Sequence, residues 1–162
     1  MKRIISTADI CDENPEKVKA ADPSGFRDFG KKKDFYGKIV TVKCFENNPY
    51  VKAALEKNGS GKVLVVDGGS SFKCALLGDN LASIAIKNRW NGIIINGCVR
   101  DSKRLSQLNI GIKALNTIPL KSGKLIEGQE NVSVYFSGID FNPGEYVYCD
   151  EDGIVVSDLL LV

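Results

Sequence analysis

The chain has 162 residues, and its hydrophobic content of 43% suits a globular fold with a sizeable buried core. Its 22 lysines and arginines against 20 acids leave a net charge of +2, too balanced to indicate direct nucleic-acid binding. There is no histidine, which excludes a histidine base. The 5 cysteines have no C-x-x-C spacing, which argues against a zinc site and favours small buried side chains in a reducing compartment.

The beginning of the chain, residues 1–6, lacks the apolar core and small-residue cleavage site of a signal peptide. No apolar run approaches the roughly 18 residues that a membrane-spanning helix needs. We therefore expect a cytoplasmic protein without a membrane contact. No repeat or linker divides the sequence, so residues 1–162 are expected to form a single domain.

Helices are predicted mainly in the first two-thirds of the chain, from capping residues and apolar periodicity. They are a short capped helix from Ser6 to Ile10, a helix opened by Asn48-Pro49 and ended by Gly59, a short helix over Phe72–Leu77, a helix capped by Asp79 or Asn80 that runs to Trp90, and a helical turn over Ser102–Gln107. Residues 22–37, by contrast, contain glycine, proline and a run of three lysines, and we expect them to form an irregular loop.

Strands are predicted from runs of β-branched and apolar residues between glycine, asparagine and proline turns. They cover Gly37–Phe45, Val63–Val66, Ile93–Ile95, Ile112–Leu115, Val132–Phe136, Glu145–Cys149 and Gly153–Ser157. The continuous apolar runs at 63–66 and 93–95 are typical of central strands covered on both faces. We therefore predict an α/β fold with helices packed against a mixed sheet and a β-rich C-terminal third.

A first candidate site is the glycine-rich turn Asp67–Ser71 at the exit of the strand over 63–66. Such a turn can hold an anion on its backbone N–H groups, or it can simply reverse the chain. It matches neither the dinucleotide-binding nor the P-loop pattern.

Two further candidates are Gly78-Asp79-Asn80-Leu81 at a helix start and Arg100-Asp101 after a strand. Twenty residues, 80–99, lie between Asp79 and Arg100. Free N–H groups at a helix start favour a carboxylate or a phosphate, and plain helix capping by Asp79 is the alternative that this short motif alone favours. Arg100 offers a fork of donors for an oxyanion, and Asp101 offers a hard oxygen ligand for Mg²⁺. The alternative for Arg100 and Asp101 is a surface ion pair, or a turn aspartate at Asp101. If the two central strands are neighbours, all three candidates would meet around a small 2-keto acid.

Several blocks of the sequence resemble the RraA-like family, which contains the regulator of ribonuclease E activity A and the class II 4-hydroxy-4-methyl-2-oxoglutarate aldolases that also decarboxylate oxaloacetate. The resemblance rests on Thr41–Asn48, Val63–Ser70, Gly78–Leu81, Gly97–Asp101 and Asn109–Leu115, and it covers nearly the whole chain.

This resemblance implies a swivelling β/β/α-type fold and a ring-shaped homotrimer with active sites near the subunit boundaries. It implies that Gly78, Asp79, Asn80 and Leu81 bind the substrate carboxylate and that Arg100 binds the keto oxygen. Asp101 would hold a divalent metal, Mg²⁺ or Mn²⁺, while Asp79 orders the waters of that metal. The apolar end, Leu159–Val162, could contribute to a subunit interface or end an internal strand.

The chain departs from the aldolase pattern of this family, which places another acid two to four residues after the Arg-Asp pair. Residues 102–108 contain none. We therefore expect decarboxylation through an enolpyruvate to be better supported than aldol cleavage. The alternative is a protein-binding regulator that inhibits a ribonuclease. Methyl transfer in menaquinone synthesis is a third label in this family, and the missing nucleotide loop argues against it.

Overall fold

A mixed sheet forms the centre of the molecule in the computed structural model, which describes residues 5–162. The strand order is β1-β12-β11-β3-β4-β6-β7-β2, with β5 beside β6 and β8 beside β3. The strands are β1 (Lys19–Ala20), β2 (Arg27–Asp28), β3 (Phe35–Lys43), β4 (Lys62–Asp67), β5 (Ala75–Leu77), β6 (Gly92–Val99), β7 (Gly111–Thr117), β8 (Gln129–Glu130), β9 (Val134–Phe136), β10 (Ile139–Phe141), β11 (Tyr146–Cys149) and β12 (Ile154–Ser157). The predicted mixed α/β class is confirmed.

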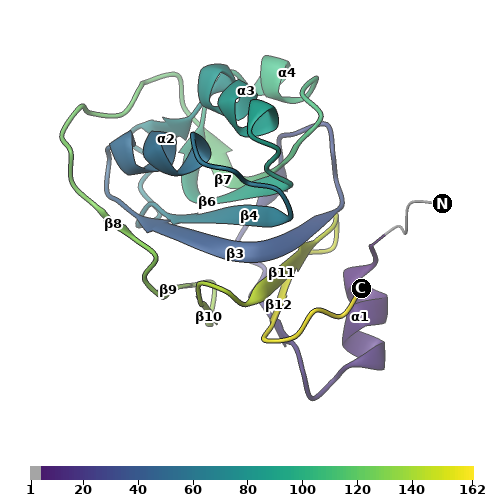
Figure 1. The fold of residues 1–162 in the computed structure, drawn as a ribbon. Coiled ribbons are helices and arrows are strands. Elements are labelled where there is room, and N and C mark those ends of the chain that lie inside the picture. Colours follow the sequence, from purple (N-terminus) through teal and green to yellow (C-terminus); the bar gives the residue numbers. More distant parts are fainter. Residues whose placement is uncertain (1–4) are drawn as a thin grey trace.

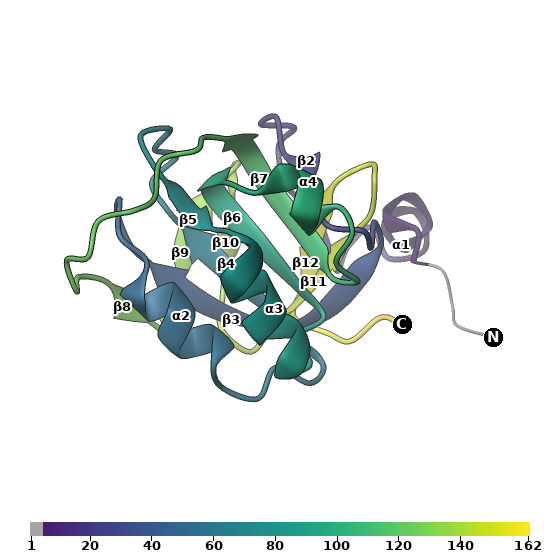
Figure 2. The same cartoon turned by 90° about the horizontal axis from the view of Figure 1, so that it is seen from above.

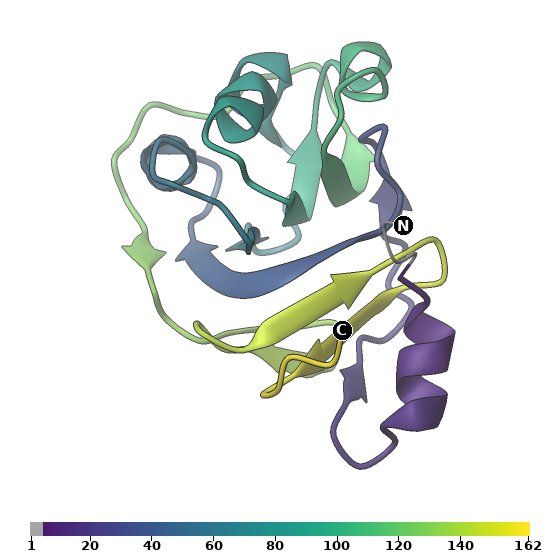
Figure 3. The ribbon, with the colours of Figure 1, turned by 45° about the vertical axis from the view of Figure 1, so that its right-hand side comes forward.

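The central strands β3, β4, β6 and β7 run parallel, and helices cover one of their faces (Figures 1 and 2). These helices are α2 (Pro49–Leu55), α3 (Asp79–Lys87) and α4 (Ser102–Leu105). Strands β9 to β12 cover the other face as a second β layer (Figure 3). Parallel strands enclosed in this way have no wet face, which explains the unbroken apolar runs of the sequence.

Alternate side chains of β4 belong to two different cores. Leu64 and Val66 pack towards the helices, whereas Val63 and Val65 pack towards the second β layer. All four are fully buried, at 0% exposure. Because successive side chains of a strand point to opposite faces, β4 ties both layers to one sheet.

The first helix, α1 (Thr7–Glu13), begins where the sequence predicts, and Ser6 caps it by accepting a 3.1 Å hydrogen bond from the Asp9 amide. It lies beside the second β layer near the C-terminus (Figure 3). Thr7 donates to Asp150 through both its amide and its hydroxyl, at 2.6 and 2.7 Å. The helices within residues 5–162 are all too short or too polar to span a bilayer.

One predicted helix is wrong. The stretch Phe72–Leu77 contains no helix, and its second half is β5, which pairs with β6 in parallel. The reason is a tertiary contact: Ala75 donates its amide to the Leu120 carbonyl at 2.8 Å, so β5 has a hydrogen-bonded neighbour on each edge. The expected irregular region after residue 22 also contains the two-residue strand β2 and the start of β3.

Lys113 is a buried cation in β7, with only 2% of its surface exposed. Its ammonium lies 3.1 Å from Asp28 Oδ1 of β2, and this carboxylate oxygen has no other partner among residues 5–162. A buried charge is tolerated only when it is paired. The pair therefore fastens the edge strand β2 to the sheet.

We expect Asp28→Asn to destabilise the fold by about 3 kcal/mol, because it leaves the Lys113 ammonium buried without a counter-charge. Urea unfolding followed by circular dichroism measures the change. The double variant with Lys113→Met should recover most of the loss, since an apolar side chain of similar length removes the unpaired charge. A single variant as stable as the wild type would contradict this account.

Candidate functional site

A cavity of about 540 Å³ opens at the carboxyl ends of β5 and β6. The starts of α2 and α3 form part of its wall, and the Arg100-Asp101 pair and the loop segment Lys121–Lys124 form the rest. Ligands of open α/β sheets bind at this end of the strands. The structure therefore brings the second and third candidates of the sequence into one cavity.

Gly78 is the N-cap residue of α3, where the sequence predicted Asp79 or Asn80. Gly78 is important because it has no side chain, which leaves space for Arg100 and Asp101. A Cβ added at Gly78 would lie 2.6 Å from Asp101 Oδ2 and 3.5 Å from Arg100 Nε. Only glycine lets both charged side chains approach the first turn of α3 this closely.

Asp101 joins the end of β6 to the start of α3. Its backbone is left-handed, with φ 60° and ψ 36°, a conformation that aspartate tolerates better than most residues. The carboxylate does not cap its own helix α4. It accepts a 3.0 Å hydrogen bond from the Asp79 amide instead. The N–H of Asp79 is therefore occupied, and the amides of this turn that remain without a hydrogen bond among residues 5–162 are those of Asn80 and Leu81.

The pKa of Asp101 is lowered from its ordinary value of 3.8. The main cause is the hydrogen bond from the Asp79 backbone, and burial opposes it by raising the pKa. The side-chain contact with Asp79 and the charges of Arg100 and Arg104 lower the pKa further. Asp101 is therefore ionised at neutral pH, as a metal ligand or anchor must be.

Arg104 is a residue of the site that the sequence did not reveal. Its guanidinium lies 2.8 Å from Asp79 Oδ2, so it neutralises the second acid of the cavity. The contact joins α4 to α3 across twenty-five positions of the chain, and no local pattern indicates it. Arg104 stands within the interval where the aldolase pattern has an acid, and here a cation turns towards Asp79.

The Asp67–Ser71 turn is not part of this cavity, so the expectation that all three candidates meet is wrong. Its amides are already used within the protein. Gly68 and Ser70 donate to the Asn96 carbonyl, and Gly69 donates to Asp67 Oδ1 at 3.0 Å. Asn96 also donates to Asp67 Oδ1, at 3.0 Å, which closes the turn. These three amides are therefore not free to cradle an anion.

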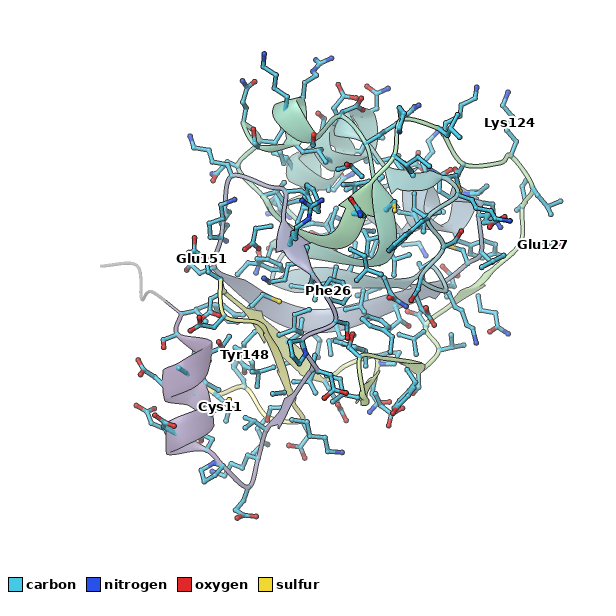
Figure 4. All side chains as sticks on the ribbon, turned by 180° about the vertical axis from the view of Figure 1, so that it is seen from behind. Cys11, Phe26, Lys124, Glu127, Tyr148 and Glu151 are labelled. Carbon is cyan, nitrogen blue, oxygen red and sulfur yellow. The ribbon has the colours of Figure 1, made fainter. Side chains whose placement is uncertain are left out.

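The loop after β7 supplies the remaining wall, and sequence reasoning missed it. Lys121 lies beside Ala75 of β5, and Gly123 donates its amide to the Glu46 carbonyl at 2.9 Å. Farther along, Lys124 and Glu127 lie at the outer edge of the loop (Figure 4). Lysines in a glycine-containing loop have the pattern of an ordinary solvated surface, so the sequence does not mark them as part of a site.

The fold and the cavity together define an α/β protein with a cavity, lined by one arginine and three lysines, at the carboxyl ends of its strands. The family model described as RraA-like (Aldolase/RraA) matches residues 7–156. The chain belongs to this family.

Similar proteins carry three different names. Proteins of Aromatoleum aromaticum (49% identical over 98% of this chain and 99% of theirs) and Pseudomonas putida (52% over 93% and 92%) are both named "Putative 4-hydroxy-4-methyl-2-oxoglutarate aldolase". A solved structure from Geobacillus kaustophilus is named S-adenosylmethionine: 2-dimethylmenaquinone methyltransferase (43% identity, TM-score 0.94, 97% of both chains). Another is named the RNA-processing inhibitor RraA from Thermus thermophilis (37%, 0.94, 99% of this chain and 96% of that one).

The lowered pKa of Asp101 predicts a pH dependence of stability. A carboxylate whose pKa falls on folding stabilises the native state above its unfolded value, near 3.8, and this contribution disappears as the pH falls through the folded value. In metal-free buffer, the difference in unfolding free energy between wild type and Asp101→Asn should stay constant from pH 7 down to about pH 5 and shrink below it. Urea titrations at each pH measure it.

Asp12→Asn is the matched control for these titrations, since Asp12 is an exposed acid of α1, an element that does not line the cavity. A difference between wild type and Asp101→Asn that grows as the pH falls below 3.8 would reverse the sign of the argument.

Proposed function

We propose that this protein is a divalent-metal-dependent carbon–carbon lyase that acts on short 2-keto acids through a pyruvate enolate. The activity would be that of a 4-hydroxy-4-methyl-2-oxoglutarate aldolase and oxaloacetate decarboxylase. One observation carries the proposal: Arg100 and the ionised Asp101 converge on the first turn of α3 inside one cavity. The aldolase name of relatives about half identical over nearly the full chain supports it.

The substrate carboxylate would bind at the start of α3, where the amides of Asn80 and Leu81 point out of the helix. A helix N-terminus attracts an anion because its first N–H groups lack partners and its dipole is positive. Gly78 would contribute by keeping this end of the helix open to the substrate. Asp79 would not contact the substrate directly, because its carboxylate is paired with Arg104.

Arg100 would bind the keto oxygen, which becomes an enolate oxygen during the reaction. Its guanidinium carries a permanent charge, and it faces no carboxylate within 4.0 Å among residues 5–162. A fixed cation at the position where negative charge develops lowers the barrier, typically by about 3 kcal/mol.

The cavity fits a hard divalent ion such as Mg²⁺ or Mn²⁺. Asp101 is its one carboxylate without a salt bridge, and no group of three or more acidic or cysteine side chains able to hold a metal occurs in residues 5–162. Mg²⁺ suits such a sparse set, because it retains several waters and needs only one or two carboxylates. Asp101 would hold the ion, which when bound polarises the keto group.

Oxaloacetate decarboxylation needs the fewest groups from the protein. The bond between C3 and the C4 carboxylate breaks, CO₂ leaves, and the electron pair becomes the enolate that Arg100 stabilises; a proton from water then completes pyruvate. Aldol cleavage additionally requires a base for the C4 hydroxyl proton. Since Asp79 is paired with Arg104, a water molecule is the base that this site offers.

Inhibition of an RNA-processing enzyme is the second candidate, favoured by the likeness to the Thermus RraA structure. It would use an outer surface rather than the cavity.

Methyl transfer, the activity in the name of the Geobacillus protein, fits less well. The cavity walls carry Lys52, Arg100, Lys121 and Lys124, and such walls repel the positive sulfonium of S-adenosylmethionine.

A homotrimer remains the proposed assembly, with the cytoplasm as its compartment. Exposed apolar side chains support an interface: Phe45, Phe72 and Leu120 are each more than half exposed. Leu159 and Leu160 are also exposed, whereas the Leu161 amide is bound to the Tyr148 hydroxyl.

Light scattering during gel filtration should give three times the chain mass of 17.6 kDa.

Purified protein should release pyruvate from oxaloacetate, and more slowly from 4-hydroxy-4-methyl-2-oxoglutarate, with Mg²⁺ but not with EDTA. Asp101→Asn should abolish this release and Arg100→Ala should lower it by about two to three orders of magnitude. Lys103→Ala, an exposed neighbour on α4, is the control. Absence of metal-dependent pyruvate from both substrates would refute the enzyme; ribonuclease inhibition retained by Asp101→Asn would then support the regulator.

Gly78→Ala should reduce the same activity by about tenfold or more, because the added Cβ occupies space needed by Asp101 Oδ2 and Arg100. The backbone of Gly78 (φ −135°, ψ −167°) is open to any residue, so the substitution adds no backbone strain, and its loss of thermal stability should not exceed that of Asp101→Asn. Full activity in Gly78→Ala would show that this close approach is unnecessary.

A further inference from the structure

Lys121 lies across β5 from Arg100. The strand β5 has β6 on one edge, where the Arg100 amide donates to the Leu77 carbonyl at 2.9 Å. On its other edge Ala75 pairs with Lys121. Because neighbouring strands are about 4.8 Å apart, the two backbones are separated by roughly 10 Å, and both side chains line the same cavity.

The cavity carries more positive charge than one carboxylate requires. Its acids are already engaged: Asp79 pairs with Arg104, and Asp101 accepts the Asp79 amide. Lys52 approaches Glu56 at 3.8 Å, whereas Lys121 and Lys124 have no ion-pair or hydrogen-bond partner for their side chains among residues 5–162. Unpaired cations lining a cavity favour an anion that reaches them.

Of the two unpaired lysines, Lys121 is the one on a fixed backbone. Its neighbours are held by the Leu120 and Gly123 hydrogen bonds, and Ser122 is buried at 8% exposure. Lys124 begins a stretch, residues 124–127, that makes no backbone hydrogen bond with other described residues and lies at the loop's outer edge (Figure 4). A pre-positioned cation loses less entropy on binding.

We propose that Lys121 binds the second carboxylate of the substrate, so that the site selects 2-keto acids with a carboxylate at each end over those with only one. The first carboxylate occupies the start of α3 beside Arg100, and the second lies against Lys121 across β5. This inference rests on the proposed function, because it assumes that 2-keto acids occupy the cavity. It adds the residue that determines the substrate class.

Two unreactive ligands of the same chain length test the inference: 2-oxoglutarate, with a carboxylate at C5, and 2-oxopentanoate, with a methyl group there. Calorimetric titration in Mg²⁺ buffer gives the affinity of each. The wild type should prefer 2-oxoglutarate by about fivefold or more, as expected for a partly exposed ion pair. Lys121→Met should remove this preference and leave 2-oxopentanoate binding unchanged.

Two further variants separate a specific contact from general charge. Lys121→Arg should retain the preference, and Lys124→Met, which removes the same charge from the less firmly bonded part of the wall, should also retain it. An undiminished preference in Lys121→Met, its loss in Lys124→Met, or no measurable binding of either ligand would overturn the inference. Discrimination by Lys121 in a protein that releases no pyruvate would instead refute only the proposed reaction.

Discussion

The hydrogen bond from the Asp79 amide to the Asp101 carboxylate holds the candidate site together. It joins the exit of β6 to the start of α3, two places twenty-two residues apart. It forms only because Gly78 has no Cβ and because Asp101 adopts a left-handed backbone that turns its carboxylate away from α4. The same bond lowers the pKa of Asp101, so one contact fixes both the position of the carboxylate and its charge.

The arrangement around this bond leaves the cavity positive. Arg104 neutralises Asp79, which removes an acid that would otherwise repel a substrate carboxylate. Arg100 remains without a close counter-ion among residues 5–162, and its position beside Gly78 places it next to the free amides of α3. An anion entering the cavity therefore meets a helix N-terminus and a guanidinium together, and the combination attracts it more strongly than either group alone.

The sequence predicts those parts of the site that local chemistry determines. The apolar runs of β4 and β6 and the glycine before α3 indicate strands and a helix start, and parallel strands necessarily end at one edge of a sheet. It does not predict β5, since three residues carry no periodicity and their pairing depends on Leu120, forty-five positions after Ala75. The sequence does not indicate Arg104 or Lys121 either, because their contacts, with Asp79 and Ala75, are also distant in the chain. The Asp67–Ser71 turn is the opposite case: its glycine-rich sequence suggests an anion site that the structure does not contain. The sequence cannot show that the amides of this turn already donate hydrogen bonds within the protein.

The pairing of Arg104 with Asp79 also limits the chemistry available to the site. A retro-aldol reaction must remove a hydroxyl proton, and the cavity's remaining carboxylate, Asp101, is tied to the Asp79 amide and kept ionised by a lowered pKa. A weak base of this kind suits metal binding better than proton abstraction, since an efficient base has a pKa near the working pH. Decarboxylation avoids this step, because departing CO₂ leaves the electron pair behind. In the proposed function, the electrostatics that would make Asp101 a good metal anchor would therefore also favour decarboxylation over aldol cleavage.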